Sequence, residues 1–149
     1  MNVCFDVNAV VYLYTDAPQQ AETLFAYDIA NLRKFAVFVP ASSPAEIHYI
    51  LHKGGLSGAA LDEALAALFS MFDVFDVAGQ DGKRALANGM KDFEDALIAE
   101  SAARNGMDVI LTYNKKDFAA SPVQAMEPGE FAAAFKPANI DYAEIELGS

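Results

Sequence analysis

The run of apolar residues at 35–39, Phe-Ala-Val-Phe-Val, is the feature that most limits the folds open to this chain. It shows no alternation of polar and apolar residues, so it predicts a strand buried on both faces, as in a parallel sheet. Other strand-forming runs occur at 3–5, 74–77, 108–112 and 123–126. Segments with helical spacing separate these runs, which predicts βαβ units. We therefore expect an α/β fold built on a mainly parallel sheet.

The helices between these strands are predicted from apolar spacing and from the residues that begin and end helices. They are expected near 9–14, 16–32, 43–54, 57–72, 80–88 and 92–104, and from 128 onward. At the start of the third helix, Ser43, Pro44 and Glu46 form the pattern of a capping box, with Pro in the first turn. Gly106 predicts the left-handed end of the helix that begins near Asp92.

Length and composition indicate one globular domain. A chain of 149 residues buries roughly 70% of its unfolded surface, which is enough for one core. The mean hydropathy is +0.16, yet no apolar run approaches the ~20 residues that a membrane-spanning helix needs. The N-terminus lacks the pattern of a signal peptide. Cys4, the single cysteine, cannot form an internal disulfide, so we expect a reducing cytoplasm.

The net charge of −11 argues against a protein that grips nucleic acid through a broad basic face. It is compatible with an acidic site whose charge is neutralised by divalent metal ions. Two of the few basic residues, Lys115 and Lys116, follow the run at 108–112, where a phosphate-bearing substrate would contact them.

Carboxylates mark the ends of the predicted strands. Asp6 follows the first strand, and Asp117 follows the fourth. Glu46 lies on the helix after the second strand, and Asp95 opens the helix before the fourth. Right-handed crossovers bring such positions to one edge of a parallel sheet, where ligands bind. Crowded carboxylates need a cation, and Mg²⁺ or Mn²⁺ suits hard oxygen ligands. Such an ion orients water for attack on phosphorus.

Five segments, in this order, resemble motifs of the PIN-domain family. They are Asp6-Val7-Asn8, Ser43-Pro44-Ala45-Glu46-Ile47, residues 92–99 (Asp-Phe-Glu-Asp-Ala-Leu-Ile-Ala), residues 112–118 (Thr-Tyr-Asn-Lys-Lys-Asp-Phe) and residues 127–131 (Glu-Pro-Gly-Glu-Phe). Each motif is weak alone, but their order and spacing are specific, and the resemblance covers roughly residues 2 to 135.

The resemblance implies a three-layer α/β/α domain at 1–136 with about five strands. The sequence departs from the family in its acidic tail at 137–149, which extends past the usual end of the domain. It implies a metal-dependent ribonuclease, often the toxin of a VapBC-type pair, with an antitoxin partner and a homodimer. The catalytic and metal-binding residues would be Asp6, Glu46, Asp95 and Asp117. Residues in supporting positions would be Asn8, Asp92, Thr112 and Asn114, and Lys115 and Lys116 would contact the RNA.

Other interpretations stay open at this point. Glu46 could serve only the capping box, and Asp92 or Asp95 could serve only as a helix cap. His48 and His52 are spaced to present two imidazoles to zinc, but position 49 is Tyr rather than the Glu of a metalloprotease. The whole chain could be a non-catalytic PIN-like module that binds RNA or protein.

A further enzyme class is a haloacid-dehalogenase-like phosphatase, whose first strand ends in an Asp nucleophile. Asn8 stands where the proton-donating acid of that motif would be. A covalent aspartyl-phosphate would distinguish this class from a nuclease.

Overall fold

The computed structural model describes residues 1–138. The expected acidic tail at 137–149 lies, apart from its first two residues, outside the described residues. The strands are β1 (Asn2–Phe5), β2 (Ala36–Pro40), β3 (Asp73–Phe75), β4 (Val109–Leu111) and β5 (Gln124–Met126). The helices are α1 (Val7–Val10), η1 (Val11–Tyr14), α2 (Gln19–Leu32), α3 (Ser43–Lys53), α4 (Gly58–Met71), α5 (Gly79–Ala87), α6 (Phe93–Arg104), η2 (Lys115–Phe118) and α7 (Pro128–Phe135), where η marks a 3-10 helix.

The strands form one five-stranded sheet in the order β3-β2-β1-β4-β5, and every neighbouring pair is parallel. Cys4 in β1 pairs with Phe38 on one side and with Ile110 on the other. The predicted α/β class and parallel sheet are therefore confirmed. The chain first builds outward from β1 to β3, then returns to the other side of β1 for β4. This reversal makes a switch point at the carboxyl ends of β1 and β4.

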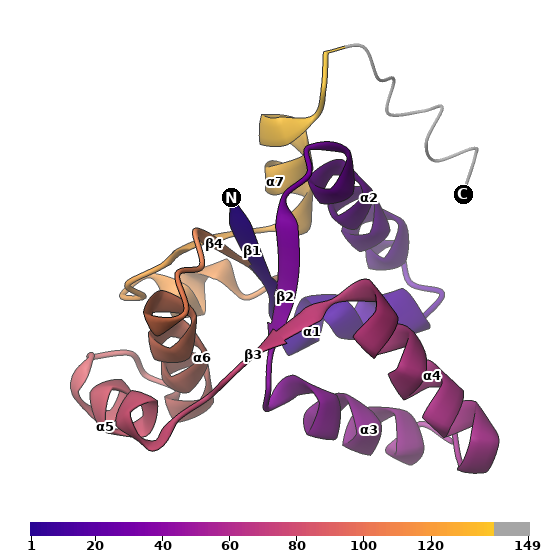
Figure 1. Ribbon diagram of the computed structural model, residues 1–149, viewed down its shortest axis with the longest axis horizontal. Coiled ribbons are helices and arrows are strands. Elements are labelled where there is room, and N and C mark those ends of the chain that lie inside the picture. The colour runs from indigo at the N-terminus through magenta and orange to yellow at the C-terminus, as the bar shows by residue number, and fades with distance from the viewer. Residues whose placement is uncertain (139–149) are drawn as a thin grey trace.

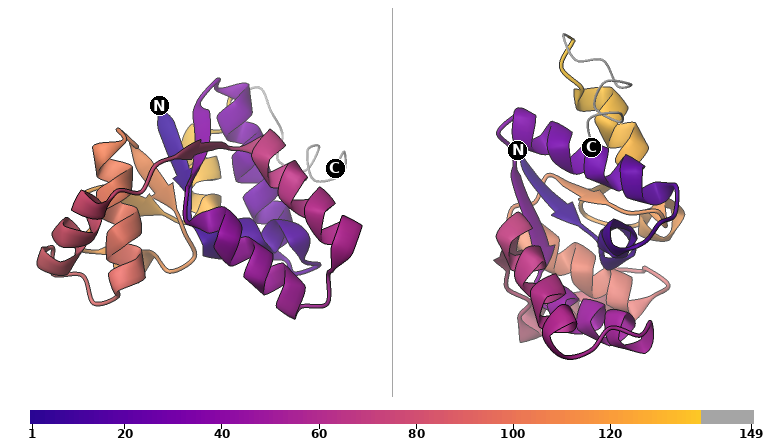
Figure 2. Two further views of the ribbon diagram at one scale, coloured as in Figure 1. Left: turned by 60° about the horizontal axis from the view of Figure 1, so that its bottom comes forward. Right: turned by 90° about the vertical axis from the view of Figure 1, so that its right-hand side faces the viewer.

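Helices cover both faces of the sheet, which gives the expected three layers. Figure 1 shows α5 and α6 on one side of the strands and α2, α3, α4 and α7 on the other. Helices α3 and α4 lie side by side as a hairpin in both views of Figure 2. Among residues 1–138, no helix combines the length and the hydropathy needed to cross a bilayer.

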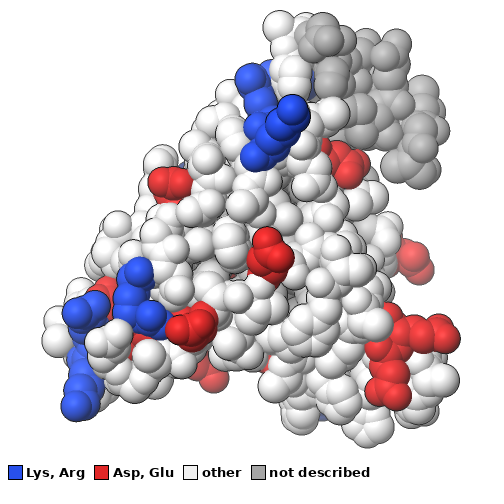
Figure 3. Space-filling model, in the orientation of Figure 1, with Lys and Arg blue, Asp and Glu red and all other residues white. Residues whose placement is uncertain are grey.

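Apart from Asp6 and Asp81, the charged side chains of residues 1–138 are at least partly exposed. On the face shown in Figure 3, basic residues appear mainly over α5 and near the end of α2, and acidic residues gather over α4. They form no continuous basic strip on this face, as expected of a chain with a net charge of −11.

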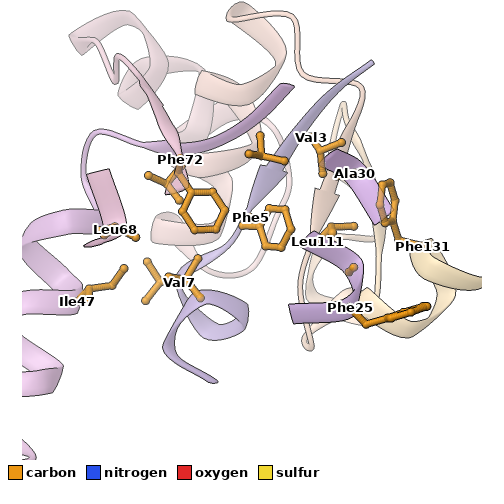
Figure 4. Packing of buried hydrophobic residues seen from close by; sticks show 14 of the residues in the cluster. Val3, Phe5, Val7, Phe25, Ala30, Ile47, Leu68, Phe72, Leu111 and Phe131 are labelled. Carbon is orange, nitrogen blue, oxygen red and sulfur yellow. The ribbon is translucent and has the colours of Figure 1, made fainter. Parts of the chain in front are cut away.

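The core has two parts, one on each face of the sheet. Val3 and Phe5 of β1 point into the larger part, in which Phe5 packs edge-on against Phe72 (Figure 4). Cys4, which alternates with them, points to the smaller part beneath α6 with Ile110. Because apolar side chains of β1 point to both faces of the sheet, helices have to cover both faces.

The start of α3 differs from the expectation. Its first helical residue is Ser43, and the preceding Ser42 already has helical backbone angles and makes no capping bond through its side chain. The Ser43 hydroxyl is buried without a hydrogen-bond partner among the described residues. The predicted capping box at Ser43 and Glu46 is therefore wrong, and the Glu46 carboxylate is not used to cap the helix.

Candidate metal centre at the sheet edge

Asp6 lies at the switch point, directly after β1, and is 5% exposed. Its two carboxylate oxygens accept one hydrogen bond each. The Val7 amide donates to Oδ1 at 2.9 Å, and the Thr112 hydroxyl donates to Oδ2 at 2.9 Å. Thr112 follows β4, the neighbour of β1, so the sheet register places the donor beside its acceptor. These bonds fix the orientation of the Asp6 carboxylate, which also lines the cavity described below.

Asn8 ties the first turn of α1 to the exit of β4. Its Oδ1 accepts the Tyr113 amide at 3.1 Å and lies 3.2 Å from the Thr112 hydroxyl. The backbone N–H of Asn114 donates to the same Thr112 hydroxyl at 3.1 Å. The Thr112 hydroxyl thus contacts Asp6, Asn8 and Asn114, which are three of the positions expected at the site.

A cavity of about 530 Å³ opens at this edge, and Asp6, Glu46 and Asp95 all line it. Glu46 comes from the first turn of α3 and Asp95 from the first turn of α6. Asp92 begins α6: its Oδ1 accepts the Asp95 amide at 2.9 Å. Asp92 is therefore the helix cap, and the Asp95 side chain faces the cavity instead.

Burial and mutual repulsion raise the pKa values of these carboxyl groups. Burial raises the pKa of Asp6, and the bonds from Thr112 and Val7 counteract part of this effect. Burial also raises the pKa of Glu46, with additions from the charges of Glu94 and Asp6. The pKa of Asp95 is raised to about 6 by burial and by four neighbouring carboxylates, Asp6 first among them. The ionised forms therefore destabilise one another.

Asp117, the fourth expected ligand, lines a neighbouring cavity of about 770 Å³. The two cavities share three lining residues: Glu94, Asp95 and Asn114. The charge of Asp117 contributes to the raised pKa of Asp95, so the two carboxylates interact. Within residues 1–138, however, no three His, Cys, Asp or Glu side chains are already gathered as ligands around one point. The structure brings three of the four into one cavity and places Asp117 beside it.

The two lysines expected to contact RNA have different surroundings. Lys116 lines the second cavity together with Asp92 and Asp117. Lys115 lies away from both cavities, and its Nζ is 2.9 Å from Oε1 of Glu130 on α7. Hydrogen bonding to Glu130 raises the pKa of Lys115.

The donor set fits a hard divalent cation. In the described part of the chain, ion pairs within 4 Å join Arg104 to Asp76 and Asp81 and join Lys115 to Glu130. None of them involves Asp6, Glu46, Asp95 or Asp117. The carboxylates at the sheet edge are thus close enough to repel one another, yet none of them forms an ion pair within 4 Å with a basic side chain of residues 1–138. Oxygen ligands of this kind match Mg²⁺ or Mn²⁺.

A sequence model of the PIN domain matches residues 2–116. This chain belongs to the PIN-domain family. The match spans the sheet edge from Asp6 to Lys116 and confirms the resemblance drawn from the motifs. No curated relative matches the sequence.

Solved structures of PIN-domain toxins share the fold. VapBC-1 from nontypeable Haemophilus influenzae aligns with a TM-score of 0.64 and 20% identity over 86% of this chain and 98% of that chain. VapBC2 from Rickettsia felis, bound to a promoter DNA fragment, aligns with a TM-score of 0.60 and 18% identity over 85% and 98%. VapC20 from Mycobacterium tuberculosis, a toxin that cleaves the sarcin-ricin loop, aligns with a TM-score of 0.61 and 16% identity over 79% and 94%.

Some residues of the site were not expected from the sequence. Glu94 lines both cavities, and Tyr12 and Tyr113 line the first. Glu94 lies within the motif at 92–99. Both Glu94 and Asp95 face the site because α6 begins directly after Asp92. His48 and His52 stack with ring centroids 6.3 Å apart on α3 and line neither cavity.

Proposed function

We propose that this PIN-domain protein is an Mg²⁺- or Mn²⁺-dependent ribonuclease that hydrolyses phosphodiester bonds of RNA. The observation that carries the proposal is the convergence of Asp6, Glu46 and Asp95 in one cavity at the switch point, where none of them is in an ion pair within 4 Å with a basic side chain of residues 1–138. The family generally uses divalent metal ions, and this cavity has the ligand chemistry that such an ion requires.

Asp6, Glu46 and Asp95 would hold the ion, with Asp117 joining from the adjoining cavity. When bound, a divalent ion supplies an oriented, more acidic water and offsets charge on the phosphate. The bonds from Val7 and Thr112 keep the Asp6 carboxylate in one orientation.

The supporting residues act on the positions of these ligands. Thr112 holds Asp6, and Asn8 holds the backbone that leaves β4. Asn114 lines both cavities. Asp92 caps α6 and so fixes the turn that presents Asp95. Lys116, which lines the second cavity, would attract RNA phosphates, whereas Lys115 would have to leave Glu130 to do so.

We further propose that the protein is the toxin of a VapBC-type pair and acts on RNA in the cytoplasm. The support is the shared fold with VapBC complexes over most of both chains. An antitoxin protein would be its partner, and a homodimer is expected from the family. A neighbouring gene that encodes a small DNA-binding protein would support this biological role independently of any assay of cleavage.

The test is cleavage of RNA by the parent and by Asp6→Asn, with Mn²⁺ or with chelator. We expect the variant to cleave at least ~100-fold more slowly, which corresponds to about 2.7 kcal/mol of transition-state stabilisation. Asp62→Asn is the matched control, because Asp62 is exposed on α4 and lines neither cavity. Equal rates for the parent and Asp6→Asn would reject the assigned site. A parent that binds RNA without metal-dependent cleavage would instead be a non-catalytic module.

A further inference from the structure

The cavity that contains the carboxylates also has an apolar side. Six of its lining residues are aliphatic or aromatic and come from four parts of the chain: Val7, Val11, Tyr12, Ile50, Ile98 and Tyr113. A metal site alone does not require such a surface. A volume of about 530 Å³ lies within the range of pockets that enclose small organic groups.

The apolar and acidic residues are separated along the helices. On α3, Glu46 precedes Ile50 by four residues, and on α6, Asp95 precedes Ile98 by three. Each pair therefore lies on one helix face, with the aliphatic side chain one turn beyond the carboxylate. The same cavity thus offers an acidic part that suits a cation and an apolar part that suits a hydrophobic ring.

Two tyrosines form the aromatic wall of this cavity. Their ring centroids are 5.1 Å apart with an interplanar angle of 78°. The Tyr113 hydroxyl is held 2.8 Å from Thr23 Oγ1 and 3.3 Å from the Gln19 carbonyl oxygen of α2. Tyr113 is therefore fixed, and Tyr12 packs against it. The Tyr12 hydroxyl has no hydrogen-bond partner among the described residues, and its ring is only partly buried.

The charges of the cavity favour a ring over a phosphate on the apolar side. None of its lining residues is Lys or Arg, and the chain carries a net charge of −11. Phosphate contacts with basic side chains usually supply most of the affinity for nucleic acid. Here the substrate must gain affinity elsewhere, and stacking on aromatic side chains contributes about 1–3 kcal/mol per base.

We propose that Tyr12 is the stacking platform for one unpaired nucleobase of single-stranded RNA next to the scissile phosphate, with Tyr113 holding its ring in place. The proposal rests on the proposed ribonuclease function and adds Tyr12 as a residue that contacts a base of the substrate. Bases in a helix are stacked on their neighbours and cannot enter the cavity, so the protein should prefer loops and single strands.

The experiment measures binding of a short fluorescent RNA in the Asp6→Asn background, in which cleavage is slow. Each RNA is compared with a copy that lacks one base, and the abasic position is moved along the strand. We expect one position at which loss of the base weakens binding roughly 5- to 100-fold. Adding Tyr12→Ala should weaken binding of the intact RNA by a similar factor and abolish the difference between intact and abasic RNA.

Tyr12→Phe should bind like its parent, because the ring is retained. Tyr49→Ala is the matched control, since Tyr49 is an exposed aromatic residue of α3 that does not line the cavity. The salt dependence of binding should be shallow, with a slope no steeper than about −2, because few phosphates meet basic side chains.

The proposal is overturned if Tyr12→Ala retains the full difference between intact and abasic RNA, or if no abasic position matters. Folding of each variant is checked by its melting temperature, and Tyr12→Leu, which removes the ring but keeps an apolar side chain, takes the place of the alanine variant if that variant is unstable. Failure of the ribonuclease function appears separately, as unchanged cleavage when Asp6 alone is substituted.

Discussion

Two buried aspartates in this molecule lie in opposite electrostatic surroundings. Asp81 on α5 is fully buried, and its oxygens accept bonds from Arg104 Nε at 2.9 Å and Nη2 at 3.0 Å. It also accepts the Ala78 amide at 2.8 Å. Asp6 is almost as deeply buried, but its hydrogen-bond donors, Val7 and Thr112, are neutral. Hydrogen bonding to Arg104 lowers the pKa of Asp81, whereas burial raises that of Asp6.

The presence or absence of a cationic partner distinguishes a carboxylate with a structural role, Asp81, from one that is available to a ligand, Asp6. Asp81 receives a cation from α6, and the bond joins the two helices that cover one face of the sheet. The carboxylates at the sheet edge receive none, so their repulsion persists until something outside the chain compensates it. The fold thus stabilises one acidic region and leaves the other unfavourable in the absence of a cation.

The largest expected effect comes from supplying that cation. Mn²⁺ at about 100 times its dissociation constant should stabilise the parent by about 2.7 kcal/mol, because the unfolded chain has no assembled site. Asp95→Asn should gain much less from the same addition. In chelator the variant should be more stable than the parent by roughly 1 kcal/mol, since it removes a charge that its neighbours disfavour and solvent screens part of that repulsion. Thermal melts measure both effects.

Asp62→Asn serves as the control for this comparison, because Asp62 is exposed on α4. It should show the metal-induced shift of the parent. Equal shifts in the parent and in Asp95→Asn, without any stabilisation in chelator, would mean that these carboxylates do not share a metal site.

Replacing aspartate by asparagine should have the opposite effect on stability at Asp81. Asp81→Asn should lower the free energy of unfolding by about 2 kcal/mol, because it removes the charge that the Arg104 bonds stabilise. Asp76→Asn is the matched control. The Asp76 side chain is 82% exposed, and its carboxylate comes no closer than 3.9 Å to Arg104 Nη1. Urea melts of both variants at pH 7 should show a loss for Asp81→Asn alone.

The pH dependence gives a second measure of this bond. The folded pKa of Asp81 lies below its ordinary value, so its contribution is fully present above an unfolded pKa of about 3.9. It is lost as the pH falls through the folded pKa. The stability gap between the parent and Asp81→Asn should therefore be constant from pH 7 to about pH 5 and narrow below about pH 4. A gap that stays constant into strong acid would show that the charge of Asp81 is not what stabilises the fold.

The strands and the main candidate ligands could be predicted because they depend on local signals. Fully apolar runs predict buried strands, and the crossover rule then places Asp6, Glu46 and Asp95 at one edge. The run at 74–77 was expected to be a strand, but β3 ends at Phe75. The Asp76 carbonyl oxygen instead accepts bonds from Arg104 and Asn105, which no local pattern reveals.

Other features depend on contacts between distant parts of the chain. The ion pair of Lys115 with Glu130 and the anchoring of Tyr113 by Thr23 join residues 15 and 90 positions apart. The capping box failed at Ser43 because the backbone at Ser42 is already helical, which turns the Ser43 hydroxyl inward. Which side chains face a cavity is decided by such packing, so the aromatic wall could not be read from spacing.

The smallest expected effect concerns the two lysines beside the acidic edge. Lys116 lines the second cavity, whereas Lys115 is already paired with Glu130 in a half-exposed ion pair. If Lys116 meets one RNA phosphate, Lys116→Ala should reduce the slope of log affinity against log salt by about 0.7. Lys115→Ala should change the slope less, because it removes a cation that Glu130 already neutralises. Binding to the Asp6→Asn protein at several salt concentrations measures both. An equal reduction for the two variants would mean that Lys115 leaves Glu130 when RNA binds, and no reduction for either would place both lysines outside the RNA path.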